Sequence, residues 1–411
     1  MGNVYTGIDI GTDSIKIVVV EKHKNKFNLL ASSCKPCSYM KNGEVTNTKG
    51  LSTLIKNSKE EIENILGLKI DKAICALDPV GLEMSIVEGK VEVEDPNNIQ
   101  GVDISNLLND VMRKQIFDET ELVMSTPIYF TIDGVKKVKD PKGCVGKTLE
   151  CKIVISSIRK SNMYRILESL KLAGIDTTDV CFKSTGDYYT VRTGSLDSKV
   201  GAVINIGETS TNISVFNKGI QIKNGILRMG SLNVDRDISY IFNCSVEESR
   251  RLKEKFGSTL VIESDEKETT EYIDNENNKK IINKLELSKV IEARIKEILK
   301  LSLDEIKNLT NRGISYIIVT GGLSEINGME YLVDSYYGNI GKVSKINVMG
   351  IRNNKYSSAL GSCIYFDEKL ALRGKTYNMV SESEYHKLVS TNEEMSGNNV
   401  ISKMFGHFFG N

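Results

Sequence analysis

The first segment whose residue types could do chemistry is GIDIGTDSIK at 7–16, which joins one apolar stretch to another. The turn within it consists of small and polar residues, Gly11, Thr12, Asp13 and Ser14. Such a turn leaves backbone N–H groups free to surround phosphate oxygens, and Lys16 would add a cation. Asp9, at the end of the first strand, could hold Mg²⁺ through water, because a hard cation near phosphates takes oxygen ligands. A purely structural hairpin is the alternative, since this is a common β motif.

A second segment, NIGETSTN at 205–212, repeats this layout in the other half of the chain. Its turn would present Gly207, Glu208 and Thr209. Two such turns on opposing lobes can grip a polyphosphate from both sides. A third segment, TGGLSEINGM at 320–329, places Gly321 and Gly322 between an expected strand and an expected helix. That position suits close approach to an adenosine ring and phosphate, although an ordinary strand-to-helix turn is the alternative.

The elements that must position these turns follow the same order in both halves. Each turn joins two apolar runs, a third strand follows, and a helical pattern comes next. We expect further strands at 27–33, 73–77, 219–226 and 314–320, and helices at 51–66 and 234–242. Helical crossovers between such strands imply partly parallel sheets, so the chain is predicted to be an α/β protein built from a duplicated unit.

Two inserts interrupt these halves. The first, at about 81–158, has its own small α+β pattern. The second would consist of helix 246–256, an acidic stretch at 263–278 and a long helix at 287–307. The acidic stretch is expected to form a solvated hairpin or loop. From residue 375 the chain becomes polar and rich in Ser, Glu and Asn, which predicts a linker after the fold has ended.

The bulk composition excludes several classes of protein. Lys plus Arg and Asp plus Glu number 54 each in 411 residues, so no excess of positive charge favours nucleic acid. No apolar run approaches the length of a membrane span, and residues 1–12 lack the pattern of a secretory signal, so we expect a cytoplasmic protein. With three histidines, no Ser-His-Asp or Cys-His arrangement can be assigned, and the catalytic residues stay unknown. Cys34 and Cys37 form a single CxxC without a second pair, so buried thiols are favoured over a zinc or redox site.

The last residues of the chain carry an apolar stripe. On a helix, the stripe would consist of Val400, Ile401, Met404, Phe405, Phe408 and Phe409. We expect this helix to bind a membrane or a partner; a helix that docks on the protein's own core is the alternative. Burial of the stripe would release on the order of 10 kcal/mol before the cost of ordering the helix, so a single tail would hold only marginally. Many tails on one filament would attach firmly through effective concentration.

The three turns occur in the order of the phosphate-one, phosphate-two and adenosine motifs of the actin, Hsp70 and sugar-kinase superfamily, and within it the chain resembles the FtsA family. The stretches that carry the resemblance are KDPKGCVGKTLECK at 139–152, VEESRRLKEKFG at 246–257, VIEARIKEI at 290–298 and ALGSCIY at 359–365. The resemblance implies an actin-like ATPase fold of two duplicated ribonuclease-H-like lobes with an FtsA-type 1C insert subdomain.

Subdomain boundaries follow from the same resemblance. The order would be 1A at 1–81, 1C at 82–158, the rest of 1A at 159–195, 2A at 196–243, 2B at 244–302, the rest of 2A at 303–345 and a return to 1A at 346–374. A flexible linker at 375–399 and an amphipathic membrane-targeting helix at 400–411 would complete the chain.

ATP and Mg²⁺ are the cofactors that the resemblance implies. The family's nucleotide contacts fall on Gly11, Thr12, Asp13, Ser14, Lys16, Gly207, Glu208, Thr209, Gly321 and Gly322, with Lys253 beside the base. One departure affects the chemistry, because the family usually has Asp and Gly where this chain has Asn205 and Glu208. A neutral amide neither offsets the charge of Mg²⁺ nor accepts a proton. Weak or absent ATPase activity is therefore expected, unless Glu208 replaces the missing carboxylate.

The implied function is that of an ATP-binding cell-division protein that self-assembles and tethers the FtsZ ring to the cytoplasmic face of the cell membrane at the division site. The expected partners are the FtsZ C-terminal peptide, further copies of the chain and an anionic membrane surface, with no nucleic acid. Arg294 and Lys296 are expected to meet the FtsZ peptide; ion pairs with Glu292 and Glu297 on a solvated helix are the alternative. The rival functions are a pilus-assembly adaptor of the PilM type and an active ATPase chaperone or small-molecule kinase of the same superfamily.

Overall fold

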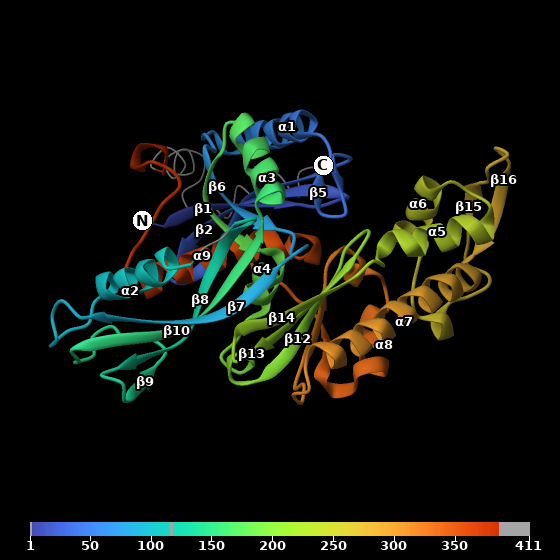
Figure 1. Cartoon of the computed structure of the whole chain (residues 1–411). Helices are drawn as coiled ribbons and strands as arrows, with labels where there is room; N and C mark the ends of the chain where they lie inside the picture. The colour runs from blue at the N-terminus through green and yellow to red at the C-terminus, as the bar shows by residue number, and fades with distance from the viewer. Residues whose placement is uncertain (1, 116–117, 386–411) are drawn as a thin grey trace.

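The computed structural model describes residues 2–115 and 118–385, and it has the mixed α/β architecture predicted from the sequence. Figure 1 shows two central sheets in the middle of an extended molecule, with a smaller sheet at one end and a helical lobe at the other. The two central sheets have five strands each. The polar turns of interest lie at strand ends of these two sheets.

The first central sheet is formed by β1 (Asn3–Ile10), β2 (Ser14–His23), β3 (Lys26–Pro36), β6 (Lys72–Leu77) and β11 (Asp176–Phe182). β1, β2 and β3 form an antiparallel meander, while β6 and β11 run parallel to β1 in the order β3-β2-β1-β6-β11. The inner strands β1, β2 and β6 are largely buried on both faces, because helices cover both sides of the sheet, whereas the edge strand β11 is polar in its first half. The carboxyl ends of β1, β6 and β11 therefore meet at one edge, where polar side chains can converge.

Four helices cover that sheet. α1 (Thr48–Leu66) and α3 (Lys160–Leu172) pack on one face, and α9 (Ser357–Leu372) packs on the other together with α4 (Lys183–Val191). α4 and α9 cross at two glycines, since a Cβ on Gly361 would lie 1.7 Å from the Gly186 carbonyl oxygen. This close crossing fixes α4, which begins directly after β11 and faces the junction between the two lobes.

The second central sheet repeats the first. It is formed by β12 (Val200–Ile206), β13 (Thr211–Asn217), β14 (Ile220–Leu227), β17 (Ile317–Thr320) and β18 (Gly341–Val343). The order is β14-β13-β12-β17-β18, again with an antiparallel meander followed by two parallel strands. α5 (Ser231–Phe242), α7 (Lys284–Leu309) and α8 (Met329–Tyr337) bury the apolar face of this sheet. The duplication predicted from the two hairpins is confirmed at the level of strand order.

A separate α+β unit lies at one end of the molecule, as the sequence pattern predicted. Its strands are β7 (Glu83–Glu92), β8 (Thr120–Ile132), β9 (Lys136–Val138) and β10 (Thr148–Arg159), in the order β7-β10-β8-β9, and its helix is α2 (Gly101–Arg113). The unit has its own apolar core between α2 and the sheet. It extends from the first lobe at the lower left of Figure 1.

The helical lobe at the other end contains α6 (Val246–Phe256), the strands β15 (Thr269–Ile273) and β16 (Lys279–Asn283), and the first half of α7. Both helices begin at side-chain caps: Ser245 accepts from the Glu248 N–H, and Asn283 accepts from the Glu286 N–H. The acidic stretch forms much of a solvated β15–β16 hairpin, as predicted. The remaining strands are the short pair β4 (Met40–Lys41) and β5 (Glu44–Val45).

The prediction that a flexible linker begins at residue 375 is wrong for its first part. Met379 and Tyr385 are buried. The Met379 N–H donates to the Val4 carbonyl (3.1 Å), and the Tyr385 hydroxyl donates to the Glu21 carboxylate (2.6 Å). The polar composition concealed a few apolar side chains, which suffice to hold this segment on β1 and β2. The predicted amphipathic helix lies outside the described residues.

Within the described part of the chain, the helices are too short or too polar to cross a bilayer.

Candidate functional site

A cleft of about 910 Å³ lies between the two lobes. Its walls contain every residue that the sequence predicted to contact a nucleotide: Asp9, Gly11, Thr12, Asp13, Ser14, Lys16, Gly207, Glu208, Thr209, Lys253, Gly321 and Gly322. These residues come from four separate stretches of the chain. The fold therefore brings the three predicted turns, together with α6, around one cavity.

The two polar hairpins have the same geometry. In the first, the Gly11 N–H donates to the Ser14 carbonyl (3.0 Å); in the second, the Gly207 N–H donates to the Ser210 carbonyl (3.0 Å). Asp9 pairs with Lys16 across the first hairpin, as Asn205 pairs with Asn212 across the second. The charged pair of the first hairpin is thus replaced by two neutral amides in the second.

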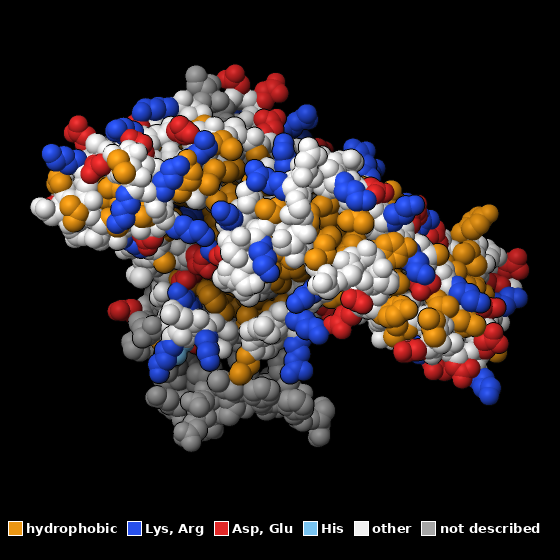
Figure 2. Space-filling model, turned by 90° about the horizontal axis from the view of Figure 1, so that it is seen from below, with side chains coloured by type: hydrophobic (Ala, Val, Ile, Leu, Met, Phe, Trp, Pro, Cys, Tyr) orange, Lys and Arg blue, Asp and Glu red, His pale blue; other side chains and the backbone are white. Residues whose placement is uncertain are grey.

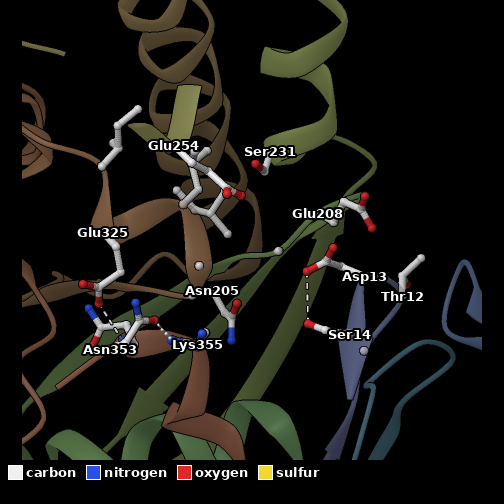
Figure 3. Close-up of a pocket in the computed structure, with 18 of the residues that line it drawn as sticks. Thr12, Asp13, Ser14, Asn205, Glu208, Ser231, Glu254, Glu325, Asn353 and Lys355 are labelled. Atoms are coloured by element: carbon white, nitrogen blue, oxygen red, sulfur yellow. Dashed lines mark hydrogen bonds between the residues drawn. The ribbon is translucent and has the colours of Figure 1, made fainter. Parts of the chain in front are cut away.

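Arg250 of α6 connects the two turns. Its guanidinium lies 3.3 Å from the Asp13 carboxylate of the first lobe and also bonds the Glu208 carboxylate of the second. Figure 3 shows Asp13 and Glu208 close together at the ends of their hairpins. Glu208, the residue that could replace a missing catalytic carboxylate, is therefore held by a cation. Sequence reasoning missed Arg250, although it lies one helical turn before Lys253 and so shares its face of α6.

Lys253 lines the cleft from α6, and its side chain is only 7% exposed. Its ammonium lies 2.6 Å from the Asp235 carboxylate, which is 1% exposed, and it also donates to the Ser231 hydroxyl at the start of α5. The pair joins α5 to α6 at the wall of the cleft. Lys253 is thus fixed in position by its partners.

Gly321 permits the closest backbone approach in the cleft wall. Its φ of 93° and ψ of 172° are available almost only to glycine. A Cβ there would lie 2.5 Å from Asn205 Oδ1 and 2.6 Å from the Ile206 carbonyl oxygen. The third turn therefore packs directly on the end of β12. Gly322 follows in an open position, where an added Cβ would meet no heavy atom within 4 Å.

Asp9 lies at the end of β1 beside two lysines. Lys183 Nζ is 3.0 Å from Asp9 Oδ1, and Lys16 Nζ is 3.7 Å from Asp9 Oδ2. Burial would raise the pKa of Asp9, but the two ammonium groups outweigh it and hold the pKa below its ordinary value. Sequence reasoning missed Lys183. The signal was the short apolar run from Val180 to Phe182, because a cation that follows a parallel strand lies at the carboxyl edge of the sheet.

The predicted magnesium site does not fit this arrangement. Mg²⁺ takes oxygen ligands in octahedral geometry and prefers unneutralised carboxylates. Asp9 is already paired with two cations, and the equivalent residue in the second hairpin is Asn205. The described residues include no cluster of three or more His, Cys, Asp or Glu side chains that could hold a metal. These side chains therefore do not fit direct coordination of a magnesium ion by Asp9, and the predicted contact through water stays a prediction.

Asn205 has a buried carboxylate as its partner. Its amide donates to Asp187 Oδ2 (2.6 Å), and the Ser358 hydroxyl donates to Asp187 Oδ1 (2.8 Å). Burial raises the pKa of Asp187 to about 6, although these two hydrogen bonds act in the opposite direction. Asp187 lies one turn after Lys183 on α4, behind the cleft wall. It was also missed, because nothing in the sequence marks the turn of α4 that faces β12.

The two residues predicted to meet a partner peptide lie on α7, away from the cleft. Arg294 bonds Asp237 (2.5 and 2.8 Å) and Glu297, and Lys296 lies 2.9 Å from Glu292. Both side chains are therefore engaged in the ion pairs that formed the alternative interpretation. The six residues of the predicted membrane-binding stripe lie outside the described residues.

Comparison with known proteins gives two family matches. Residues 202–361 match the family model described as "Cell division protein FtsA", and residues 81–157 match "SHS2 domain inserted in FTSA". The second match covers the α+β unit built from β7, α2, β8, β9 and β10.

Relatives of known name span nearly the whole chain. The cell division protein FtsA of Bacillus subtilis (strain 168) is 26% identical over 378 residues, which cover 90% of this chain and 85% of the relative. That of Enterococcus faecalis (strain ATCC 700802 / V583) is 24% identical over 434 residues, which cover 98% of both chains.

Solved structures share the fold. The PilM-PilN type IV pilus biogenesis complex matches with a TM-score of 0.60 and 16% identity, covering 88% of this chain and 98% of that one. MreB5 of Spiroplasma citri bound to ADP matches with a TM-score of 0.54 and 10% identity, covering 90% and 98%. The predicted actin-like fold is thereby confirmed.

Proposed function

The chain belongs to the FtsA family of cell-division proteins, and from that premise we propose that it binds ATP between its lobes, self-assembles and tethers FtsZ filaments to the cytoplasmic face of the membrane. The observation that carries the proposal is the convergence of all twelve predicted contact residues on one cleft. The location would be the division site, where membrane and filament meet.

Nucleotide binding is supported by the form of the cleft. The turns at Gly11 and Gly207 line the cleft from opposite lobes, and polar glycine turns of this kind suit a chain of phosphates. The Gly321 turn brings the backbone of the second lobe close to the same cavity. Of the side chains that line the cleft, seven are Lys or Arg and six are Asp or Glu. An anion therefore meets a slightly cationic lining.

Slow or absent hydrolysis is part of the proposal. Asn205 takes the place where the family usually has Asp, and its amide is occupied by Asp187. Glu208 is bound to Arg250 and does not provide an unpaired base. ATP would then act as a bound ligand that closes the lobes and favours filaments.

Membrane attachment would come from the stripe at residues 400–411, and FtsZ would be held by the helical lobe. Arg294 and Lys296 could receive an acidic peptide only by exchanging carboxylate partners, since both are paired in the structure. Figure 2 shows hydrophobic side chains gathered on this lobe. Ile262 of the lobe is 86% exposed, and Tyr240 of the adjoining α5 is 89% exposed. An FtsZ peptide with apolar anchors would find more unpaired surface there than at the two cations.

The test is co-sedimentation of the purified full-length chain with anionic liposomes, with and without ATP and with a peptide from the FtsZ C-terminus. We expect ATP to increase pelleting and the peptide to be recovered in the pellet. Samples without liposomes separate filament sedimentation from membrane binding. Deletion of residues 398–411 should abolish association with liposomes and leave ATP binding intact.

Other outcomes would point to other functions. Loss of both properties on deletion would mean that the tail is part of the fold. A protein that stays in the supernatant but holds a peptide from a membrane partner would be an adaptor of the PilM type. Brisk ATP turnover with a small substrate would refute the adaptor proposal and require a catalytic role near Asn205.

A further inference from the structure

The ammonium group of Lys183 has the surroundings of a bound cation. Its Nζ lies 2.8 Å from the Ile10 carbonyl oxygen, 3.0 Å from Asp9 Oδ1 and 3.6 Å from Asp78 Oδ2. The side chain is 12% exposed and lines the cleft. Three oxygens from two strand ends thus surround one positive charge beside the phosphate-facing turn.

The fold explains why these groups meet. Asp9 and Ile10 end β1, Asp78 follows the end of β6, and Lys183 follows the end of β11. These three strands run parallel and are neighbours, so their carboxyl ends lie along one edge of the sheet. Lys183 is also the first residue of α4, whose crossing with α9 holds it at this edge.

A divalent cation at this position would meet two ammonium groups. Lys183 and Lys16 both approach Asp9, and a cation at this place would have to displace the ammonium groups that neutralise this buried carboxylate. The equivalent position in the second lobe, Asn205, adds no negative charge to attract the ion. The two ammonium groups carry the same formal charge as a magnesium ion, and they face the Asp9 and Asp78 carboxylates that such an ion would otherwise meet.

We propose that Lys183 takes the place of the divalent cation, so that the cleft binds a nucleoside polyphosphate without metal. The Lys183 and Lys16 ammonium groups would face the phosphates directly, as point charges on fixed side chains. The inference rests on the proposed nucleotide-binding function. It adds a specific property to that function, since affinity should be independent of Mg²⁺.

The experiment is a titration of the full-length protein with a fluorescent ATP analogue in buffer with MgCl₂ and in buffer with EDTA. For the wild type we expect the two dissociation constants to agree within about threefold, well under one tenfold step of about 1.4 kcal/mol. A fall in affinity of more than about tenfold in EDTA would overturn the inference and leave the proposed nucleotide site intact. Absence of binding in both buffers would overturn the nucleotide site itself.

Variants test the role of Lys183. Lys183→Met should weaken binding in EDTA by about 10- to 100-fold, the loss expected for a charge-assisted contact. Binding by this variant should recover in part with MgCl₂, because Asp9 and Asp78 then have room for a cation. Lys183→Arg keeps the charge and should stay independent of Mg²⁺. Equal affinities of Lys183→Met and the wild type in EDTA would contradict the inference.

A matched control is Lys369→Met. Lys369 forms a similarly buried ion pair with Asp179 (2.7 Å), outside the cleft. This variant should lose stability but bind the analogue like the wild type in both buffers. If Lys183→Met fails to fold by circular dichroism, the wild-type comparison and Lys183→Arg decide the question.

Discussion

Asp9 on β1 and Asn205 on β12 hold the same position in two copies of one hairpin. Each is the second-last residue of the first strand of its hairpin. Their surroundings are opposite. Asp9 is paired with two lysines, whereas the Asn205 amide donates to the buried carboxylate of Asp187. The duplicated unit has therefore kept its backbone and changed its charges.

The first prediction concerns Asn205→Asp. The new carboxylate would lie about where the amide nitrogen is, 2.6 Å from Asp187 Oδ2, so two like charges would share a buried site. We expect a loss of about 3 kcal/mol in unfolding free energy at neutral to alkaline pH. The loss should shrink at acid pH, because one proton shared by the two carboxylates restores a hydrogen bond. Urea denaturation of the variant and the wild type at neutral pH and at acid pH measures this loss of unfolding free energy.

The control exchanges the two groups. In the double variant Asn205→Asp with Asp187→Asn, one amide again faces one carboxylate, and most of the lost stability should return. If the change in unfolding free energy of the double variant equals the sum of the changes in the two single variants, the two side chains do not interact, and the prediction fails.

The second prediction is a pH dependence set by Asp187. Burial raises its pKa to about 6 from an ordinary value of 3.8. Between these values the unfolded chain loses a proton that the folded chain keeps, so the contribution of Asp187 to stability falls as pH rises. Over this pH range the unfolding free energy should lose about 3 kcal/mol through Asp187, at about 1.36 kcal/mol for each pKa unit.

Asp187→Asn has no such titration. The unfolding free energy of this variant should therefore rise relative to the wild type as pH increases from about 4 to about 7. Taking the difference between the two curves removes the opposite contribution of groups such as Asp9, whose pKa is lowered. Two parallel curves would refute the prediction.

The sequence was sufficient to predict the fold and the walls of the cleft. The two hairpins and the Gly321 turn are local patterns of glycine and polar residues between apolar runs, and local patterns can be read from one sequence. Long helices such as α6 and α7 were also predicted, because their apolar periodicity and caps lie within the element.

The interior of the site was not predictable in this way. Lys183 and Asp187 lie on α4, which joins the two lobes, and their partners Asp9 and Asn205 are distant in sequence. The pairing of Lys183 with Asp9 and of Asp187 with Asn205 depends on how α4 packs against the ends of β1 and β12. The segment 375–385 was misjudged for a related reason, since a few buried side chains in a polar stretch carry no periodic signal.

The third prediction concerns the cation between the two turns. Arg250→Gln would leave the Asp13 and Glu208 carboxylates facing each other without a counter-ion. Stability should fall by only about 1 kcal/mol, because the guanidinium is partly exposed. Affinity for a nucleotide should fall by about tenfold, since two unpaired carboxylates would repel the phosphates. Titration with a fluorescent ATP analogue measures the change.

Arg251→Gln is the matched control. Arg251 is the next residue of α6, has the same exposure, and bonds Glu248 on its own helix away from the cleft. Its loss should leave nucleotide affinity unchanged. Adding Glu208→Gln to Arg250→Gln should recover part of the affinity; no recovery would mean that Arg250 acts by touching the ligand rather than by neutralising Glu208.

The last prediction compares two adjacent glycines. Gly321→Ala would force a side chain into a φ of 93° and ψ of 172°, with its Cβ within 2.6 Å of Asn205 Oδ1 and the Ile206 carbonyl oxygen. The Ile206 carbonyl belongs to the backbone of a central strand and cannot shift without disturbing the sheet. We therefore expect the unfolding free energy to fall by about 3 kcal/mol or more. Gly322→Ala meets no atom within 4 Å and has no positive φ, so its unfolding free energy should change by less than about 1 kcal/mol. Thermal and urea denaturation of the two variants would be compared in parallel. Equal losses would mean that the positive φ of Gly321 and its close contact with β12 do not determine the cost of the substitution.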